Sequence, residues 1–195
     1  MLKVKNLKLL NGKVINLEVN PGEILFIKGA NGAGKSLFLK SLARLIPSSW
    51  DELSFNNKSM THYPIEMWRS KITYLPPEVC FSDESSVDEY LAEPFLLKRY
   101  KNFKTKFEPQ KNLTNLAGTM KLLSSGQRQR IALLRAMSLD SDILLLDESF
   151  GHMDQATREE FFNLLAKWVE KGKILLIVSH FEIGMRNLKT SEFII

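Results

Sequence analysis

The chain has 195 residues, of which 44% are hydrophobic and 25% charged, and its formal net charge is +5 at pH 7. This composition excludes a disordered or collagen-like chain. The single cysteine, Cys80, excludes an internal disulfide and a multi-cysteine metal site. The low cysteine content favours a reducing compartment. No apolar run approaches the roughly 20 residues of a membrane-spanning helix, and the N-terminus has no apolar signal core, so we expect neither a span nor a secretory leader.

At the N-terminus, residues 2–19 predict short β-strands. Ile15, Leu17 and Val19 alternate with polar side chains, as expected of a strand with one buried face. The pair Asn11-Gly12 favours a hairpin turn between two strands. We therefore expect a small antiparallel β subdomain at this end of the chain.

Five compact apolar runs then predict the strands of a second sheet. They occupy residues 24–28, 72–75, 143–146, 174–178 and 193–195. Runs without alternation are typical of parallel strands buried on both faces, and helical spacing over residues 35–46 and 155–170 indicates helices between them. The chain is therefore predicted to be an α/β protein with a mostly parallel sheet flanked by helices.

Residues 77–122 interrupt this alternation and predict a small α-helical insertion within a single domain that spans residues 1–195. Ser86 and Glu89 have the spacing of a helix capping box. Basic residues interleaved with aromatic ones follow between positions 98 and 106. This basic run suits a solvated helix face, and a phosphate-binding or docking surface stays open as an alternative.

A glycine-rich segment at residues 29–36 matches the pattern G-x-x-x-x-G-K-[ST] between a predicted strand and a predicted helix. Its glycines let successive N–H groups and the helix N-terminus face a phosphate, Lys35 reaches the β- and γ-phosphates, and the Ser36 hydroxyl suits Mg²⁺. The pattern therefore predicts a site for nucleotide phosphates and Mg²⁺. Its candidate residues are Gly29, Asn31, Gly32, Ala33, Gly34, Lys35, Ser36 and Leu37.

The apolar run at 143–146 ends in two carboxylates, Asp147 and Glu148. Successive side chains on a strand point to opposite faces, so the two can serve different purposes at the carboxyl edge of the sheet, where ligands bind. We expect Asp147 to hold Mg²⁺ opposite Ser36. We expect Glu148 to act as the general base that polarises an attacking water.

A last set of motifs identifies a family. Residues 29–36, 123–127, 143–148, 149–154 and 178–180 resemble, in that order, the Walker A, signature, Walker B, D-loop and switch-histidine motifs of ABC-type ATPases. Ser125 stands where the signature usually has its first glycine. The resemblance covers nearly the whole chain, and it implies a P-loop NTPase that binds and hydrolyses ATP with Mg²⁺.

In that family, two nucleotide-binding subunits pack head to tail around ATP. The resemblance implies that Lys35, Glu148 and His180 are catalytic, with His180 contacting the γ-phosphate within its own chain. It places Asp154 in the D-loop and implies that the signature contacts the nucleotide of the partner subunit. The signature residues are Ser124, Ser125, Gly126 and Gln127.

Two positions depart from the family pattern. Pro77 stands where a glutamine usually helps to hold Mg²⁺, and proline has no side-chain oxygen, so Glu78 is a candidate substitute. No aromatic residue before Phe26 is available to stack on adenine, and Leu10 lies near the expected place. We therefore expect altered coupling and a weaker preference for ATP over other nucleotides.

The resemblance implies the ATP-hydrolysing subunit of a membrane transporter, of the compact bacterial type. The expected partners are a second copy of the chain, as a homodimer, and a separate transmembrane permease, without direct contact to nucleic acid. This implies a cytoplasmic location, peripheral on the inner face of the cell membrane, and the end of the chain after its last strand predicts no regulatory domain. An alternative is a soluble ABC-type ATPase that acts on nucleic acid or ribosomes; the signature and His180 argue against another P-loop enzyme such as a kinase.

Overall fold

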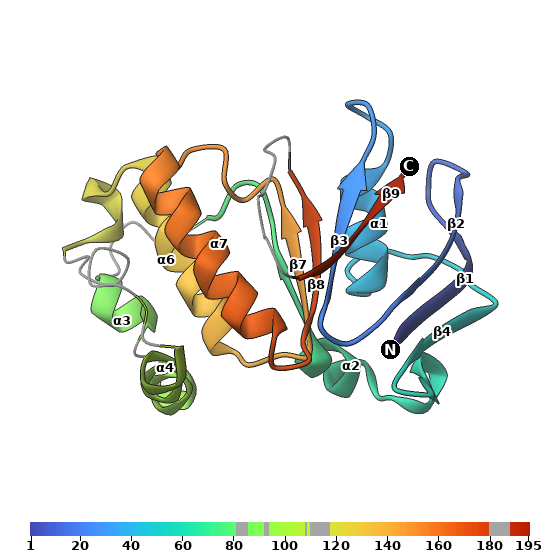
Figure 1. Ribbon diagram of the computed structural model, residues 1–195, viewed down its shortest axis with the longest axis horizontal. Coiled ribbons are helices and arrows are strands. Elements are labelled where there is room, and N and C mark those ends of the chain that lie inside the picture. The colour runs from blue at the N-terminus through green and yellow to red at the C-terminus, as the bar shows by residue number, and fades with distance from the viewer. Residues whose placement is uncertain (81–85, 92–93, 108, 110–117, 180–187) are drawn as a thin grey trace.

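The structure, a computed structural model of the 195-residue chain, describes all residues except 81–85, 92–93, 108, 110–117 and 180–187. Two β-sheets and the helices packed on them make up the described part (Figure 1). Among the described residues, no helix has the length and apolar character needed to cross a membrane.

A five-stranded parallel sheet lies at the centre of the molecule (Figure 1). Its order is β6-β7-β8-β3-β9, and every neighbouring pair is parallel. The strands are β3 (Glu23–Lys28), β6 (Ile72–Leu75), β7 (Ile143–Asp147), β8 (Ile174–Val178) and β9 (Lys189–Ile194). The predicted α/β class is therefore confirmed. Strand β9 begins well before the predicted run, because this edge strand carries exposed polar side chains that an apolar pattern does not include.

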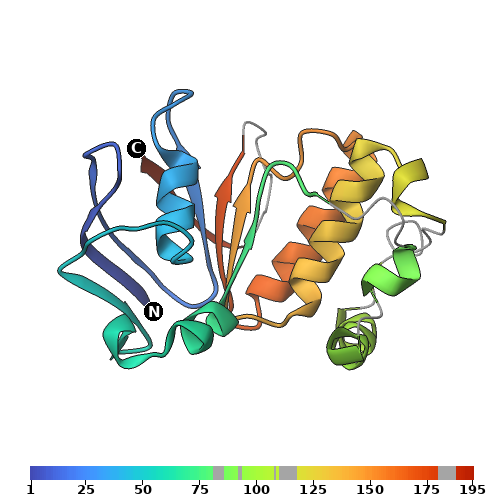
Figure 2. The ribbon, with the colours of Figure 1, turned by 180° about the vertical axis from the view of Figure 1, so that it is seen from behind.

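Side chains of the central strands alternate between two cores. In β7, Leu144 and Leu146 face one core, while Ile143 and Leu145 face the other. Helices α6 (Ser125–Ser138) and α7 (Gln155–Val169) cover the first face, and α1 (Lys35–Leu42) lies on the second, toward the antiparallel sheet (Figure 1 and Figure 2). Burial on both faces explains why these strands are uninterrupted apolar runs in the sequence.

The second sheet is antiparallel and comes from the first part of the chain. Its order is β2-β1-β4-β5. The strands are β1 (Leu2–Lys8), β2 (Val14–Val19), β4 (Glu52–Phe55) and β5 (Lys58–Ser59), and the 3₁₀ turn η1 (Met60–His62) and helix α2 (Ile65–Lys71) lead on to β6. Gly12 in the first turn has a φ of 82°, as a tight hairpin turn requires. The predicted antiparallel subdomain is confirmed, and β4 and β5 extend it.

Helix α1 ends before the predicted boundary at residue 46. Arg44 takes a left-handed conformation with a φ of 54°. The Arg44 N–H then donates to the Ser41 carbonyl at 3.0 Å, and the Leu45 N–H donates to the Lys40 carbonyl at 2.9 Å. These two bonds form the Schellman arrangement that closes many helix C-termini. Helical spacing of apolar residues does not reveal such a closure, so the predicted helix was too long.

Trp68 of α2 also holds the end of α1, because its indole N–H donates to the Leu42 carbonyl at 2.8 Å. Trp68 is fully buried. We expect Trp68→Phe to lower the free energy of unfolding by about 2 kcal/mol, since the buried carbonyl loses its donor and the smaller ring leaves a gap. Urea unfolding followed by circular dichroism measures this change. Trp50→Phe, at a half-buried tryptophan of the same core, is the control, and equal losses in the two variants would contradict the capping role.

The helical insertion contains two helices and a turn in its described part. They are α3 (Val87–Leu91), α4 (Pro94–Phe107) and the 3₁₀ turn η2 (Met120–Leu122). The predicted capping box is present: the Ser86 N–H donates to Glu89 Oε2 at 2.7 Å, and the Glu89 N–H donates to Ser86 Oγ at 3.1 Å. That the insertion and the sheets form one domain over residues 1–195 stays a prediction.

Helix α4 has one buried and one exposed face. Phe103 and Phe107 are buried in the core that α6 and α7 share. The basic side chains that the structure describes on this helix are exposed, namely Arg99, Lys101 and Lys104. This exposure agrees with a solvated helix face and equally with a docking surface, so the two interpretations of the basic run both stay predictions.

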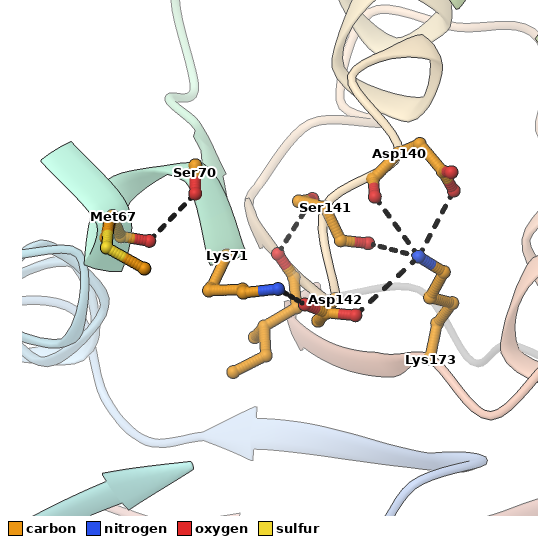
Figure 3. Close-up of polar contacts among 8 residues, drawn as sticks. Met67, Ser70, Lys71, Asp140, Ser141, Asp142 and Lys173 are labelled. Carbon is orange, nitrogen blue, oxygen red and sulfur yellow. Dashed lines mark hydrogen bonds and ion pairs between the residues drawn. The ribbon is translucent and has the colours of Figure 1, made fainter. Parts of the chain in front are cut away.

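A network of lysines and aspartates lies at the amino ends of the parallel strands (Figure 3). Lys173, just before β8, donates to the Ser141 carbonyl at 2.9 Å and pairs with Asp140 at 3.1 Å. Asp142, just before β7, pairs with Lys71 at 3.0 Å and lies 3.9 Å from the Lys173 ammonium. The network ties the starts of β6, β7 and β8 together, at the edge opposite their carboxyl ends.

Candidate nucleotide-binding site

The loop between β3 and α1 forms one wall of a cavity of about 430 Å³ at the carboxyl edge of the parallel sheet. Residues 31–37 and Glu148 line this cavity, and Gly29 lines an adjoining space together with Lys35. Gly34 precedes α1 with a φ of 107°, which residues with a side chain rarely adopt. The structure thus brings the predicted residues 31–37 together around one cavity, with Gly29 at an adjoining space that shares Lys35.

Lys35, the first residue of α1, is 7% exposed. Its ammonium donates to the Gly29 carbonyl at 2.9 Å and to the Ala30 carbonyl at 3.0 Å. The positive end of the α1 dipole lies at the same place. Cation and helix dipole together favour an anion in the cavity, which is the chemistry that a phosphate requires.

Asp147 ends β7 with its side chain fully buried. The Tyr74 hydroxyl on β6 donates to Asp147 Oδ2 at 2.9 Å, whereas Oδ1 has no hydrogen-bond partner among the described residues. Burial and the negative charge of Asp147 raise the pKa of Tyr74 well above its usual range, so the phenol stays a donor. The sequence prediction missed Tyr74; the available signal was a phenol inside a predicted strand of the parallel sheet.

Glu148 lies differently from its neighbour Asp147, because it is exposed and lines the cavity. Its N–H donates to the Val178 carbonyl at 2.9 Å, and its φ of 49° is left-handed, which is uncommon for a residue other than glycine. This turn at the end of β7 places Glu148 at the cavity. The general-base role itself stays a prediction.

Asp147 and Ser36 offer donors that suit Mg²⁺. This ion prefers oxygen ligands, and it is usually bound by one or two carboxylates together with water and substrate phosphates. The unpartnered Oδ1 atom of Asp147 is buried, and Ser36 lines the cavity near the start of α1. Within the described part of the chain, no group of three or more acidic, histidine or cysteine side chains is placed to hold a metal. The residues present therefore fit an ion that takes its other ligands from a bound nucleotide.

The signature segment begins α6. Ser124 is the N-cap: its Oγ accepts from the Gln127 N–H at 3.2 Å, and Gln127 Oε1 accepts from the Ser124 N–H at 2.9 Å. A side chain on Gly126 would overlap the carbonyl oxygen of His152, so the D-loop packs directly on the start of α6. The described lining of the phosphate cavity includes none of the predicted signature residues. Within one chain, the signature therefore stays apart from Lys35 and Glu148.

Asp154 is the N-cap of α7. Its Oδ1 accepts from the Thr157 N–H at 2.8 Å and its Oδ2 from the Thr157 hydroxyl at 2.8 Å, and the backbone bond is the main reason that the pKa of Asp154 is lowered. Arg130 of α6 donates to the same Thr157 hydroxyl at 3.2 Å. Asp154 thus stabilises the D-loop in its own chain, and its role across a dimer stays a prediction.

Three further predicted positions have different outcomes. His180 belongs to a segment outside the described residues. Glu78 is exposed and, like Asp147, does not belong to the described lining of the cavity, so its role as a magnesium ligand stays a prediction. Leu10 is 64% exposed in the β1–β2 turn, and the adjacent Asn11 donates to the Ala33 carbonyl at 3.3 Å, so this turn adjoins the phosphate loop. An adenine contact at Leu10 and a weaker ATP preference stay predictions.

The fold and the cavity define the class first: a loop that joins a parallel strand to a helix and faces an acidic strand end is the site of a P-loop nucleotide-binding domain. Comparison with known proteins then gives the family. The sequence model of the ABC transporter family matches residues 13–151, which is more than half of the chain. The chain therefore belongs to the ABC transporter family.

Individual relatives agree with this family. Over 178 residues, the chain is 35% identical to the multidrug resistance-like ATP-binding protein MdlA of Buchnera aphidicola subsp. Schizaphis graminum, covering 86% of this chain and 31% of that protein. It is 32% identical to the manganese transport system ATP-binding protein MntB of Bacillus subtilis, covering 91% of this chain and 72% of that protein. The chain spans about a third of the length of the MdlA proteins that it matches.

A solved structure shares the fold. It is the dimeric post-hydrolysis state of the ATP-binding cassette MJ0796 bound to ADP and Pi. The likeness has a TM-score of 0.76 at 25% sequence identity, over 93% of this chain and 88% of that one. The predicted P-loop NTPase fold is thereby confirmed.

Proposed function

We propose that this chain binds ATP with Mg²⁺ and hydrolyses it in a head-to-tail dimer of two identical subunits, and that this cycle drives a separate transmembrane permease. One observation carries the proposal: the cavity gathers the phosphate loop and Glu148, whereas the signature at the start of α6 lies outside it. One chain therefore presents the two halves of a composite site on different surfaces. A second copy can supply the signature that the first lacks at its own cavity.

Each residue of the proposed site has a separate task. Lys35 and the N-terminus of α1 bind the β- and γ-phosphates, and Asp147 and Ser36 hold the metal. When bound, Mg²⁺ neutralises charge on the phosphates. Glu148, at the cavity because of its left-handed backbone, accepts the proton of the attacking water, and His180 contacts the γ-phosphate.

The test is the mass of Glu148→Gln in solution, measured by light scattering with and without MgATP. Glutamine keeps the size of the side chain but does not take the proton of the water, so ATP stays intact between the subunits. We expect a monomer without nucleotide and a dimer with MgATP. Glu170→Gln, the same change at an exposed residue after α7, is the matched control and should not stabilise a dimer.

Two other outcomes would contradict parts of the proposal. A Glu148→Gln variant that binds ATP in a titration but stays monomeric would exclude the homodimer and would require another chain to supply the signature. A wild-type chain that does not bind MgATP would contradict the assignment of the cavity itself.

The transport part of the proposal is supported by the relatives. MdlA is named as a multidrug resistance-like ATP-binding protein, MntB as the ATP-binding protein of a manganese transport system, and CysA of Synechocystis as a sulfate/thiosulfate import ATP-binding protein. These names share ATP binding and differ in cargo. We therefore assign cargo recognition to the permease, and we place this chain on the cytoplasmic face of the membrane through that partner.

A further inference from the structure

The register of the central sheet brings Tyr74 and Asp147 together. Tyr74 of β6 pairs with Leu145 of β7, and Asp147 lies further along β7 on the same face as Leu145. Neighbouring strands lie about 4.8 Å apart and rise about 3.3 Å per residue, so such diagonal neighbours are roughly 8 Å apart, a gap that a tyrosine side chain spans. The Tyr74 hydroxyl closes this gap and donates to Asp147 Oδ2 at 2.9 Å.

This bond gives the two carboxylate oxygens of Asp147 different surroundings. The phenol occupies Oδ2, and Oδ1 is buried without a partner among the described residues. Asp147 is 0% exposed, so bulk water does not compete for either oxygen. The contact therefore holds one oxygen of the carboxylate and leaves Oδ1 without a hydrogen-bond partner among the described residues.

We propose that Tyr74 is a positioning residue for the metal: its hydroxyl holds Asp147 so that Oδ1 alone is presented to Mg²⁺. This inference rests on the proposed Mg²⁺-dependent function. Groups that hold a metal ligand in place typically contribute about 10-fold or more to metal affinity.

The test compares the wild-type chain with Tyr74→Phe, which keeps the ring against the core and removes only the hydroxyl. Mn²⁺ replaces Mg²⁺ as the probe, and electron paramagnetic resonance follows its binding to protein loaded with a non-hydrolysable ATP analogue. We expect the dissociation constant for Mn²⁺ to rise about 10-fold, while the affinity for the analogue in EDTA changes by less than about twofold. The affinity in EDTA reports an intact phosphate site, which separates a lost metal ligand from a damaged fold.

Two further variants serve as the negative and the positive control for Mn²⁺ binding. Tyr63→Phe, the same change at a tyrosine that packs on Trp68, is the matched control and should bind Mn²⁺ like the wild type. Asp147→Asn removes the proposed ligand charge and should bind Mn²⁺ more weakly than Tyr74→Phe.

Three results would overturn the inference. Equal Mn²⁺ affinities for the wild type and Tyr74→Phe would do so and would leave the proposed function standing. If Tyr74→Phe lost as much affinity for the ATP analogue in EDTA as it lost for Mn²⁺, Tyr74 would support the fold and not the metal. Analogue binding by the wild type that is independent of Mn²⁺ would overturn the magnesium site, and the inference with it.

Discussion

Lys35→Ala is expected to lower the affinity for ATP by about 100-fold or more, which corresponds to about 2.7 kcal/mol. In the free protein the ammonium donates to the carbonyls of Gly29 and Ala30, so it is already held within the loop that faces the cavity. A hydrogen bond to a charged group contributes about 1.5–3 kcal/mol, and in the proposed site Lys35 donates to the β- and γ-phosphates. Alanine removes these bonds and also the contacts that close the loop.

Calorimetric titration with MgATP measures this loss of affinity. Lys40→Ala, at a half-buried lysine in the last turn of the same helix, is the matched control. It removes a charge from α1 at a position outside the lining of the cavity, so its affinity should stay near that of the wild type. An unchanged affinity in Lys35→Ala would show that the phosphates bind elsewhere, and would contradict the assignment of residues 29–36.

The parallel sheet could be predicted because strands that are buried on both faces consist of uninterrupted apolar residues. The strands at 143–146 and 174–178 contain apolar residues alone, and short runs of this kind favour such strands. The edge strand β9 lies partly in solvent, and the same argument missed its first four residues because they are polar. The end of α1 was missed for a different reason, because Arg44 closes it through backbone bonds that no apolar spacing encodes.

The site could be predicted where its residues are neighbours in the chain. Residues 29–37 form one loop and the start of one helix, so their spacing determines where they lie. The bond from Tyr74 to Asp147 and the contact of Gly126 with His152 join distant segments. They depend on strand register and on the packing of α6, which a local pattern does not specify. Sequence reasoning therefore found the loop at residues 29–37 but missed the contacts that support Asp147 and the D-loop.

Gly126→Ala is expected to lower the free energy of unfolding by about 1–3 kcal/mol, the usual cost of extra volume in a packed site. A Cβ on Gly126 would overlap the carbonyl oxygen of His152, and this neighbour is backbone that cannot rotate away as a side chain does. The D-loop would have to move from the start of α6. Because Arg130 of α6 donates to Thr157 of α7 at 3.2 Å, the same movement would also strain that connection.

The matched control is Gly151→Ala in the D-loop. A Cβ on Gly151 would lie 3.8 Å from the Glu148 carbonyl oxygen, which is an ordinary contact. This change should alter the free energy of unfolding by less than about 0.5 kcal/mol. Urea unfolding measures both variants, and light scattering in the Glu148→Gln background measures their dimerisation with MgATP. If Gly126→Ala lost dimerisation at unchanged stability, the glycine would serve only the contact with nucleotide across the dimer. Loss of both together would mean that this glycine first sets the D-loop against α6 within its own chain, and that each subunit needs this spacing to present its signature to the partner's phosphates.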